Sequence, residues 1–376
     1  MKNISRYKVE NGIVIPLIIF SVISIISIYS AEKLLPAYMN GLYIKQSIWY
    51  IFGFIIAFAL MSLGNNFIYK NIWILYWLGI ASLMALLIFG VPINGAKCWF
   101  VIPYIGSIQP SEFMKIILII VLARVINEFN GDYKEATIKE EFKLLVKVAI
   151  IVGIPSVLTF LQPDTGLVII YLIITMIMLF VSGIRYGWFV LIFGLGLLIG
   201  GSVVGIYFLN HDLFINLFGT NLFYRLDRVF DWSSGSGMQL RNAITAIGSA
   251  GFLGNGFAKT PVYFPAPHTD FIFAIFASNF GFLGIIVLLS LFLFFNLKLI
   301  SLANKDIDNI NKYIIAGIVG MLIYQQFQNI GMTIGLMPIN GITLPFISYG
   351  GSSLLSYMII AGIIFNISNE SLRFTN

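Results

Sequence analysis

The sequence predicts an all-α polytopic membrane protein with about ten transmembrane helices. Hydrophobic residues make up 59% of its 376 residues and charged residues only 10%, whereas soluble domains carry roughly 25% charged residues. Crossing a hydrocarbon core of roughly 30 Å takes about 20 apolar residues. Segments of that kind lie near 12–30, 46–63, 71–90, 111–127, 144–162, 166–183, 186–208, 270–298, 312–336 and 346–368. Because no stretch has the charged composition of a soluble domain, residues 1–376 are expected to form one membrane domain.

The first segment is too long and too poorly followed by a cleavage site to be a removable signal peptide, so it is expected to remain as the first span. Most lysines and arginines then lie in connections on the side of the N-terminus, and the short connections on the other side hold only Lys33, Lys45 and Lys97. Positive residues favour the cytoplasmic side. Both termini are therefore predicted to be cytoplasmic.

Two connections on the predicted outer side are informative. One is 91–110, and the other is 209–269, a long extracytoplasmic loop between helices 7 and 8. A connection of some 60 residues is usually functional rather than a simple link. Within it, residues 238–250 have helical spacing and are expected to form a helix along the membrane interface.

Composition excludes several classes of protein. The single cysteine, Cys98, rules out an internal disulfide, and two scattered histidines exclude an ordinary zinc site. The net charge of +6 follows the membrane topology. Membrane lipids are therefore expected as partners, and nucleic acid is not.

Glu112 and Lys115 are the charged pair inside a predicted span. They are three residues apart, so they share a helix face and can neutralise each other. This pair is either a structural ion pair near the interface or the polar floor of an outward-facing cavity. Asp164, next to Pro163, suits a helix start, where an acidic residue favours the positive end of the helix dipole.

Asp270 lies where the long loop meets helix 8, beside His268. As a carboxylate at a helix start it could simply cap the helix. The alternative is general-base catalysis on a phosphate-bearing substrate, because the same loop carries several cations. These are Arg225, Arg228, Arg241 and Lys259. Contact with lipid headgroups is the competing interpretation of the four.

Two further motifs lie near the same membrane face. Lys97 and Trp99, in GAKCWF, are candidates for substrate contact, although an interfacial tryptophan is commonly only a belt anchor. Ser348 and Gly350 belong to LPFISYGGSS at 344–353. Small residues there could allow close helix packing, or proline and paired glycines could break a helix and line a cavity.

Seven motifs, in order, carry a resemblance to a known family. They are GAKCW at 95–99, QPSEFMK at 109–115, LQPDTG at 161–166, AIGS at 246–249, HTDFIFA at 268–274, FQNIGMTIG at 327–335 and LPFISYGGSS at 344–353. Together they resemble the SEDS family (shape, elongation, division and sporulation), which includes RodA, FtsW and SpoVE, and look most like the RodA group of Gram-positive rods.

The resemblance implies a ten-helix peptidoglycan glycosyltransferase of the bacterial cytoplasmic membrane, with its site facing outside, for cell elongation, division or sporulation. It would polymerise lipid II beside a class B penicillin-binding protein that crosslinks the strand. Asp270 would be the catalytic residue and Trp99 functionally important, with Glu112 and Lys115 in a polar cavity. One inverting displacement suits this chemistry, with positive charge for the pyrophosphate from loop arginines or from a divalent cation such as Mg²⁺ or Mn²⁺.

The chain departs from the family pattern at four positions. Ser278 and Asn279 stand where most members carry glutamates, Ala266 replaces another glutamate, and Asn340 replaces a threonine. Two other functions stay open. One is a flippase for lipid-linked sugars, and the other is a non-catalytic scaffold that recruits a transpeptidase.

Overall fold

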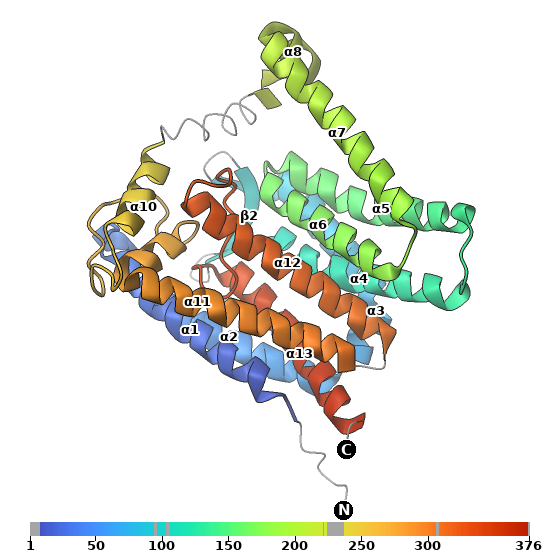
Figure 1. The fold of residues 1–376 in the computed structure, drawn as a ribbon, viewed down its shortest axis with the longest axis horizontal. Helices are drawn as coiled ribbons and strands as arrows, with labels where there is room; N and C mark the ends of the chain where they lie inside the picture. Colours follow the sequence, from blue (N-terminus) through green and yellow to red (C-terminus); the bar gives the residue numbers. More distant parts are fainter. Residues whose placement is uncertain are drawn as a thin grey trace, which may run out of the picture.

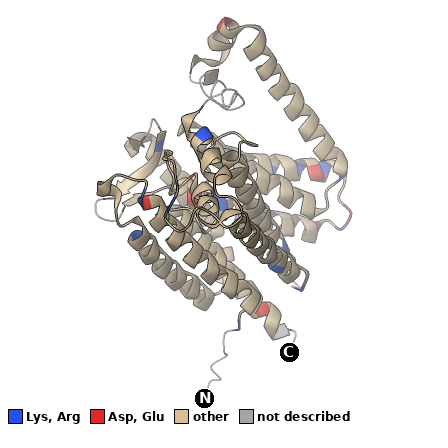
Figure 2. Ribbon diagram, turned by 60° about the vertical axis from the view of Figure 1, so that its left-hand side comes forward, with Lys and Arg blue, Asp and Glu red and all other residues tan. Residues whose placement is uncertain are grey.

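A computed structural model describes residues 8–93, 96–102, 106–220, 222–223, 237–305 and 308–374. The described part is an all-α bundle whose long helices match the ten predicted segments (Figure 1). Their bounds are α1 Asn11–Glu32, α2 Leu42–Leu63, α3 Asn65–Phe89, α4 Pro110–Asp132, α5 Ile138–Leu161, α6 Thr165–Ser182, α7 Tyr186–Leu209, α11 Ile272–Lys305, α12 Asn309–Thr333 and α13 Gly351–Phe374. Shorter helices are η1 Ala37–Met39, α8 His211–Phe218 and α10 Met238–Gly248. Figure 2 shows how few charged residues interrupt these helices.

Within the described residues, eight helices are long and apolar enough to cross a membrane. The two long helices outside that set are α4 and α12, which carry more polar residues. Both lie inside the bundle: α4 packs against α3, α6, α12 and α13, and α12 packs against α6 and α11. A helix that other helices shield from lipid can carry polar side chains, because these find partners in the protein. The predicted arrangement of about ten spans therefore keeps its two most polar members at the centre.

Local sequence signals set several helix starts. Pro110 occupies the first turn of α4, where its missing N–H costs nothing. Thr137 and Glu140 form a capping box at the start of α5. Asp164 caps α6, because its carboxylate accepts the Leu167 N–H at 3.2 Å.

Helix α7 leaves the bundle and leads to α8 (Figure 1). None of its most apolar stretch is buried inside the protein. Its first turn is held by Glu141 of α5, which accepts the Trp188 indole N–H at 2.7 Å and lies 3.5 Å from the Arg185 guanidinium. Helix α7 is therefore attached to the bundle at one end.

A small antiparallel sheet lies in the segment 91–110, which the sequence predicts only as a connection. Its strands are β1 Val91–Ile93, β2 Ala96–Ile102 and β3 Gly106–Ile108, in the order β1-β2-β3. Strand β2 is tied to the turn before α6, because the buried Cys98 thiol donates to the Gln162 carbonyl oxygen at 2.9 Å. Period-two alternation is weak in so short a segment, which is why the sequence did not predict strands.

Helix α11 is broken at Gly281, a feature that the sequence did not predict. Gly281 has φ 63° and ψ −161°, a backbone conformation that is essentially restricted to glycine. The predicted helix at 238–250 is confirmed as α10, which packs against α11 and α12. In the described residues, the 60-residue connection thus contains α8 and α10 before it reaches Asp270.

The segment 334–350, between α12 and α13, is not helical. Phe346 anchors it in the core, stacked on Phe20 at 5.7 Å and edge-on to Phe295 at 5.8 Å. Gly351 lies against α2, where an added Cβ would come within 2.7 Å of the Trp49 ring. Both interpretations of LPFISYGGSS therefore hold in part, since it combines close packing with a non-helical stretch.

Candidate active site

The backbone on which Asp270 sits is held by three hydrogen bonds from other elements. The carbonyl groups of residues 268–270 accept, in chain order, the Tyr349 N–H at 2.9 Å, the Ser348 hydroxyl at 2.7 Å and an Asn329 side-chain N–H at 2.9 Å. We call this arrangement the carbonyl clamp. Because its donors come from α12 and from the segment 334–350, those elements fix the position of the Asp270 backbone.

The Asp270 carboxylate is partly buried and forms no ion pair within the described residues. Burial raises its pKa to about 6, and a hydrogen bond with the Thr269 hydroxyl acts in the opposite direction. Gly341 lies close by, since a Cβ added there would be 3.7 Å from Oδ2. A carboxylate with a pKa just below neutral is suited to accept a proton from a substrate.

His268, two residues before Asp270, carries a neutral imidazole. Burial lowers the His268 pKa to about 4. Its Nδ1 is buried and has no hydrogen-bond partner in the described part of the chain, and its ring lies 5.6 Å from the ring of Tyr349. His268 can therefore offer a substrate a hydrogen bond, but not a positive charge, at neutral pH.

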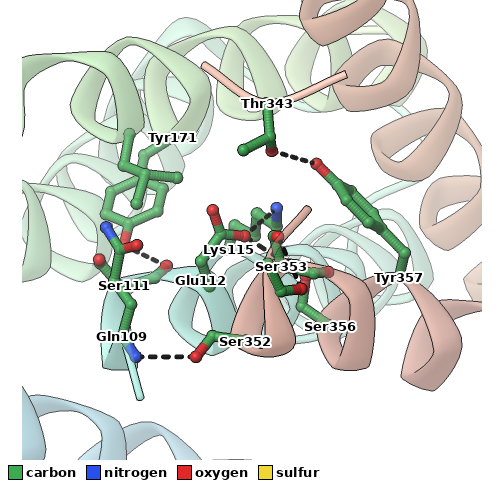
Figure 3. A network of polar contacts seen from close by, with 12 residues as sticks. Gln109, Ser111, Glu112, Lys115, Tyr171, Thr343, Ser352, Ser353, Ser356 and Tyr357 are labelled. Carbon is green, nitrogen blue, oxygen red and sulfur yellow. Dashed lines mark hydrogen bonds and ion pairs between the residues drawn. The ribbon is translucent and has the colours of Figure 1, made fainter. Parts of the chain in front are cut away.

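A second polar cluster lies deeper, around Glu112 and Lys115 (Figure 3). Lys115 is fully buried, and its Nζ lies 2.5 Å from Glu112 Oε2. It also lies 4.3 Å above the ring of Tyr357, and the Ser356 hydroxyl donates to the same Glu112 oxygen at 3.4 Å. The pair predicted to neutralise each other does so, and α13 supplies Ser356 and Tyr357 beside it.

Asp164 joins this cluster through Gln109. The Gln109 side-chain amide donates to Asp164 Oδ2 at 2.7 Å, and the Gln109 backbone N–H donates to the Ser352 hydroxyl at 3.0 Å, as Figure 3 shows. Asp164 therefore ties the start of α6 to the start of α4. Its role as a helix cap is complete without any substrate.

The segment 334–350 contacts both the surroundings of Asp270 and the polar cluster around Glu112 and Lys115. Its Asn340 carbonyl packs against Gly166, where an added Cβ would be only 2.9 Å away, next to Asp164. Its Gly341 lies beside Asp270, and its Thr343 hydroxyl is 3.3 Å from the Tyr357 hydroxyl above Lys115. A change in this segment would therefore alter the surroundings of both Asp270 and Lys115.

The structure does not connect every predicted site residue to Asp270. Trp99 is half-buried and pairs with Val91 in the sheet, and Lys97 is exposed. Within the described residues, no hydrogen bond, ion pair or ring contact joins either of them to Asp270. Ser348 belongs to the carbonyl clamp, whereas Gly350 lies one residue beyond it.

The predicted cations are the least defined part of the site. Arg225 and Arg228 lie outside the described residues. Arg241 and Lys259 are exposed, on α10 and in the segment that follows it. No three His, Cys, Asp or Glu side chains of the described chain come together in a way that could hold a metal ion.

Asn329 is a site residue that the sequence analysis did not single out. Its buried side-chain amide donates to both the Asp270 carbonyl and the Ile342 carbonyl, at 2.9 Å and 2.7 Å. A signal was present, because Gln325, Gln328 and Asn329 are costly residues to place within a membrane span. Their spacing puts them on one face of α12.

The comparisons with known proteins agree with this architecture. Residues 11–373 match the FtsW, RodA and SpoVE family model, described as "Cell cycle protein". Probable peptidoglycan glycosyltransferase FtsW of Bacillus subtilis is 34% identical over 77% of this chain and 71% of its own length. Peptidoglycan glycosyltransferase MrdB of Helicobacter pylori is 31% identical over 94% of this chain and 87% of its own.

Solved structures show the same fold. A structure titled "Structural coordination of polymerization and crosslinking by a peptidoglycan synthase complex" covers 97% of this chain and 99% of its own, with 25% identity and a TM-score of 0.80. The rod shape determining protein RodA of Thermus thermophilus covers 96% and 97%, with 24% identity and a TM-score of 0.69. At that identity the RodA likeness supports the fold alone.

Proposed function

This chain belongs to the FtsW, RodA and SpoVE family of membrane proteins, and we propose on that basis that it is a peptidoglycan glycosyltransferase that polymerises lipid II. The observation that carries the proposal is Asp270. It is a carboxylate with a pKa of about 6, held by its backbone rather than by an ion pair. The family relatives named as peptidoglycan glycosyltransferases support the reaction class.

In the proposed reaction, Asp270 acts as the general base. It removes the proton from a sugar hydroxyl of the acceptor, and that oxygen attacks the anomeric carbon of the donor. The bond from this carbon to the undecaprenyl pyrophosphate breaks, so one displacement inverts the anomeric centre. The proton remains on Asp270 until solvent or the released pyrophosphate takes it.

The donor's pyrophosphate needs positive charge as it leaves. Arg241 and Lys259 are exposed on the Asp270 side and free to meet it. We assign the same role to Arg225 and Arg228 from their place in the sequence, with Trp99 and Lys97 as further substrate contacts. His268, which stays neutral, contributes a hydrogen bond to bound substrate instead.

The orientation and the partner also belong to this proposal. The lysine and arginine pattern places the Asp270 side outside the cytoplasmic membrane, where lipid II is used. The synthase complex whose fold this chain shares coordinates polymerization with crosslinking. We therefore propose a class B penicillin-binding protein, a transpeptidase, as the partner.

The decisive experiment is polymerisation of purified lipid II by the protein in bilayers. Asp270→Asn keeps the shape of the side chain and removes the base, so glycan strands should fall by at least a hundredfold. The matched control is Asp212→Asn, an exposed carboxylate in the same long connection, which should retain the rate. Unchanged thermal unfolding would show that both variants fold.

The alternative functions predict different results. Lipid II that crosses vesicle membranes without forming polymer would favour a flippase. Tight binding of the transpeptidase with neither polymer nor flipping would favour a scaffold. Full polymerisation by Asp270→Asn would overturn the assignment of the base.

A further inference from the structure

The segment 346–350, just before α13, is bonded to α1 and α2 as well as to the backbone around Asp270. Its carbonyl groups at 346, 347 and 348 each accept a hydrogen bond from a buried side chain. In that order the donors are Tyr50, Ser24 and Gln46, with Ser24 at 2.8 Å and Gln46 at 3.2 Å. We call these three side chains the α1–α2 support. Three consecutive carbonyl groups are thus held from α1 and α2.

Gln46 has the most contacts within this support. It lies one turn after the start of α2 and is fully buried. Its side-chain nitrogen donates to the Ser24 hydroxyl and to the Ser348 carbonyl, both at 3.2 Å, and its side-chain oxygen accepts the Gly350 N–H at 3.4 Å. A buried amide within a membrane span is costly and needs a reason. Here both polar atoms of the amide have partners, and the segment 346–350 supplies two of them.

Phe346, at the start of this segment, has an unfavourable backbone conformation. Its φ is 64°, a region that bulky residues rarely adopt. Such a conformation persists only where the surrounding structure imposes it. The Tyr50 hydroxyl donates to the Phe346 carbonyl, and the Phe346 ring is stacked on Phe20 of α1. The path of the segment is therefore imposed by α1 and α2.

The same segment supplies two of the three hydrogen bonds of the carbonyl clamp. The Ser348 hydroxyl and the Tyr349 N–H donate to the carbonyls of residues 268–269. Ser348 is thus bonded twice, because its own carbonyl accepts from Gln46 while its hydroxyl donates to the clamp. Only Ser348 and two hydrogen bonds separate Gln46 from the peptide that precedes Asp270.

The turn before Asp270 depends on such external contacts. Ala266 has φ 52°, another conformation that is uncommon without glycine. Its carbonyl accepts the N–H groups of Thr269 and Phe271 at 3.3 and 3.2 Å, which is at the long end of the usual range. These internal bonds alone would hold the Asp270 backbone weakly. The clamp, and what fixes the clamp, therefore set its position.

We propose that Gln46 is a positioning residue for Asp270, through which the α1–α2 support fixes the backbone that carries the general base. This inference rests on the proposed glycosyltransferase function. Gln46 is fully buried and bonds only to Ser24 and to the segment 346–350 within the described chain. Its effect therefore belongs to the transfer step and not to the binding of substrate.

Gln46→Met separates this role from general packing. The new side chain has a similar length and bulk but lacks both N–H groups and the acceptor oxygen. The matched control is Asn366→Leu. Asn366 is also a buried amide, and it ties α13 to the Leu60 carbonyl and the Asn65 side chain at 3.0 and 3.2 Å, at the opposite ends of α13 and α2. Thermal unfolding of both variants gives the folded fraction at which their rates are compared.

Steady-state polymerisation of lipid II is the first readout. We expect kcat of Gln46→Met to fall roughly tenfold or more while KM changes by less than about twofold, because displacement of a catalytic group mainly slows the chemical step. Asn366→Leu should keep its kcat. An unchanged kcat in folded Gln46→Met would overturn the inference, and so would equal losses in the two variants.

Hydrogen–deuterium exchange tests the positioning without any activity. In Gln46→Met, exchange should become faster in peptides that cover 344–352 and also in those that cover 266–274, whereas Asn366→Leu should change neither. Faster exchange in 344–352 alone would overturn the inference, because the α1–α2 support would not reach Asp270. If the unsubstituted protein made no glycan, the proposed function would fail, and the exchange result would still decide whether Gln46 positions the Asp270 backbone.

Discussion

At the scale of single residues, what distinguishes Asp270 from the other part-buried acids is which of its groups are bonded. Glu32, Glu141 and Asp164 use their carboxylate oxygens to hold backbone or side-chain N–H groups of neighbouring helices. Asp270 is held instead through its main-chain carbonyl. Its carboxylate, whose pKa burial raises, interacts with the adjacent Thr269 hydroxyl and holds no neighbouring helix, so it remains available to a substrate.

The raised pKa of Asp270 predicts the pH dependence of polymerisation. Only the ionised carboxylate can accept a proton, so activity should be lost as the pH falls through about 6. An unperturbed aspartate would place this loss near 3.9. Initial rates between pH 4.5 and 8 would check the position of the limb.

His268→Gln separates this assignment from a histidine effect. Because burial lowers the His268 pKa to about 4, the acid limb should stay near pH 6 in this variant, whatever its maximal rate. A limb that disappears on substitution of His268 would contradict the assignment.

The carbonyl clamp predicts a positioning role for Asn329. In Asn329→Leu, a side chain of similar size has no N–H donors, so the carbonyl clamp on residues 268–270 loses one of its three hydrogen bonds. We expect kcat to fall by roughly ten- to a hundredfold with little change in KM, because small displacements of a catalytic group carry such costs. Steady-state kinetics with purified lipid II would measure both constants.

Asn296→Leu is the matched control for Asn329→Leu. Asn296 is another buried amide, but it donates to Gln326 and has no bond to the clamp. If both variants lost activity in proportion to their thermal stability, the effect would be structural and the positioning role of Asn329 would be wrong.

At the scale of elements, the sequence predicted helices better than it predicted their interruptions. Long apolar segments gave the ten helices, because the hydrophobic effect is additive along a segment. The break at Gly281 could not be read in the same way. It depends on the loop around Gly254, which lies 27 residues earlier in the chain and supplies the partners of the free backbone groups.

The same distinction separates the site residues that the sequence could predict from those that it could not. Asp270, Glu112 and Lys115 were identifiable because charge near or within a membrane segment is costly and needs a reason. Asn329 and Tyr349 were not, because their importance lies in which carbonyls they meet. That information belongs to the tertiary structure, in which α12 and the segment 334–350 approach residues 268–270.

Gly281→Ala should destabilise the protein. Its φ and ψ suit only glycine, and the new Cβ would lie 2.3 Å from the Gly254 nitrogen. We expect a cost of about 1–3 kcal/mol from the backbone alone, measured as a lower thermal unfolding midpoint in detergent. Gly153→Ala, inside α5 and with open space at the added Cβ, should leave the midpoint nearly unchanged, and an equal fall in both would refute the special role of Gly281.

At the scale of the whole molecule, the arrangement is a polar centre inside an apolar shell. Helix α12 carries a group of buried amides and α4 carries the Glu112–Lys115 pair, and more apolar helices lie around these two. The segments that meet at the site are distant in sequence, yet all lie at one end of the bundle. They are the start of α4, the start of α6, residues 268–270 and the segment 334–350.

Topology is the prediction that belongs to this scale. Lys259→Cys should react with a membrane-impermeant maleimide on intact cells, and Lys134→Cys should react only after the membrane is opened. Both positions are exposed and lie at opposite ends of the bundle, and native Cys98 is buried. The reverse labelling pattern would place Asp270 in the cytoplasm and exclude polymerisation outside the cell.

Because α7 is attached to the bundle at one end only, the bilayer can change the angle of this helix. The tilt of most helices in the bundle is set by their neighbours, but α7 is held through Glu141 at its first turn and none of its most apolar stretch is buried. A helix in that position adjusts its tilt to hydrophobic mismatch. Thinner and thicker bilayers should therefore change the angle of α7 while the central helices keep theirs, and a single detergent would display only one of these angles.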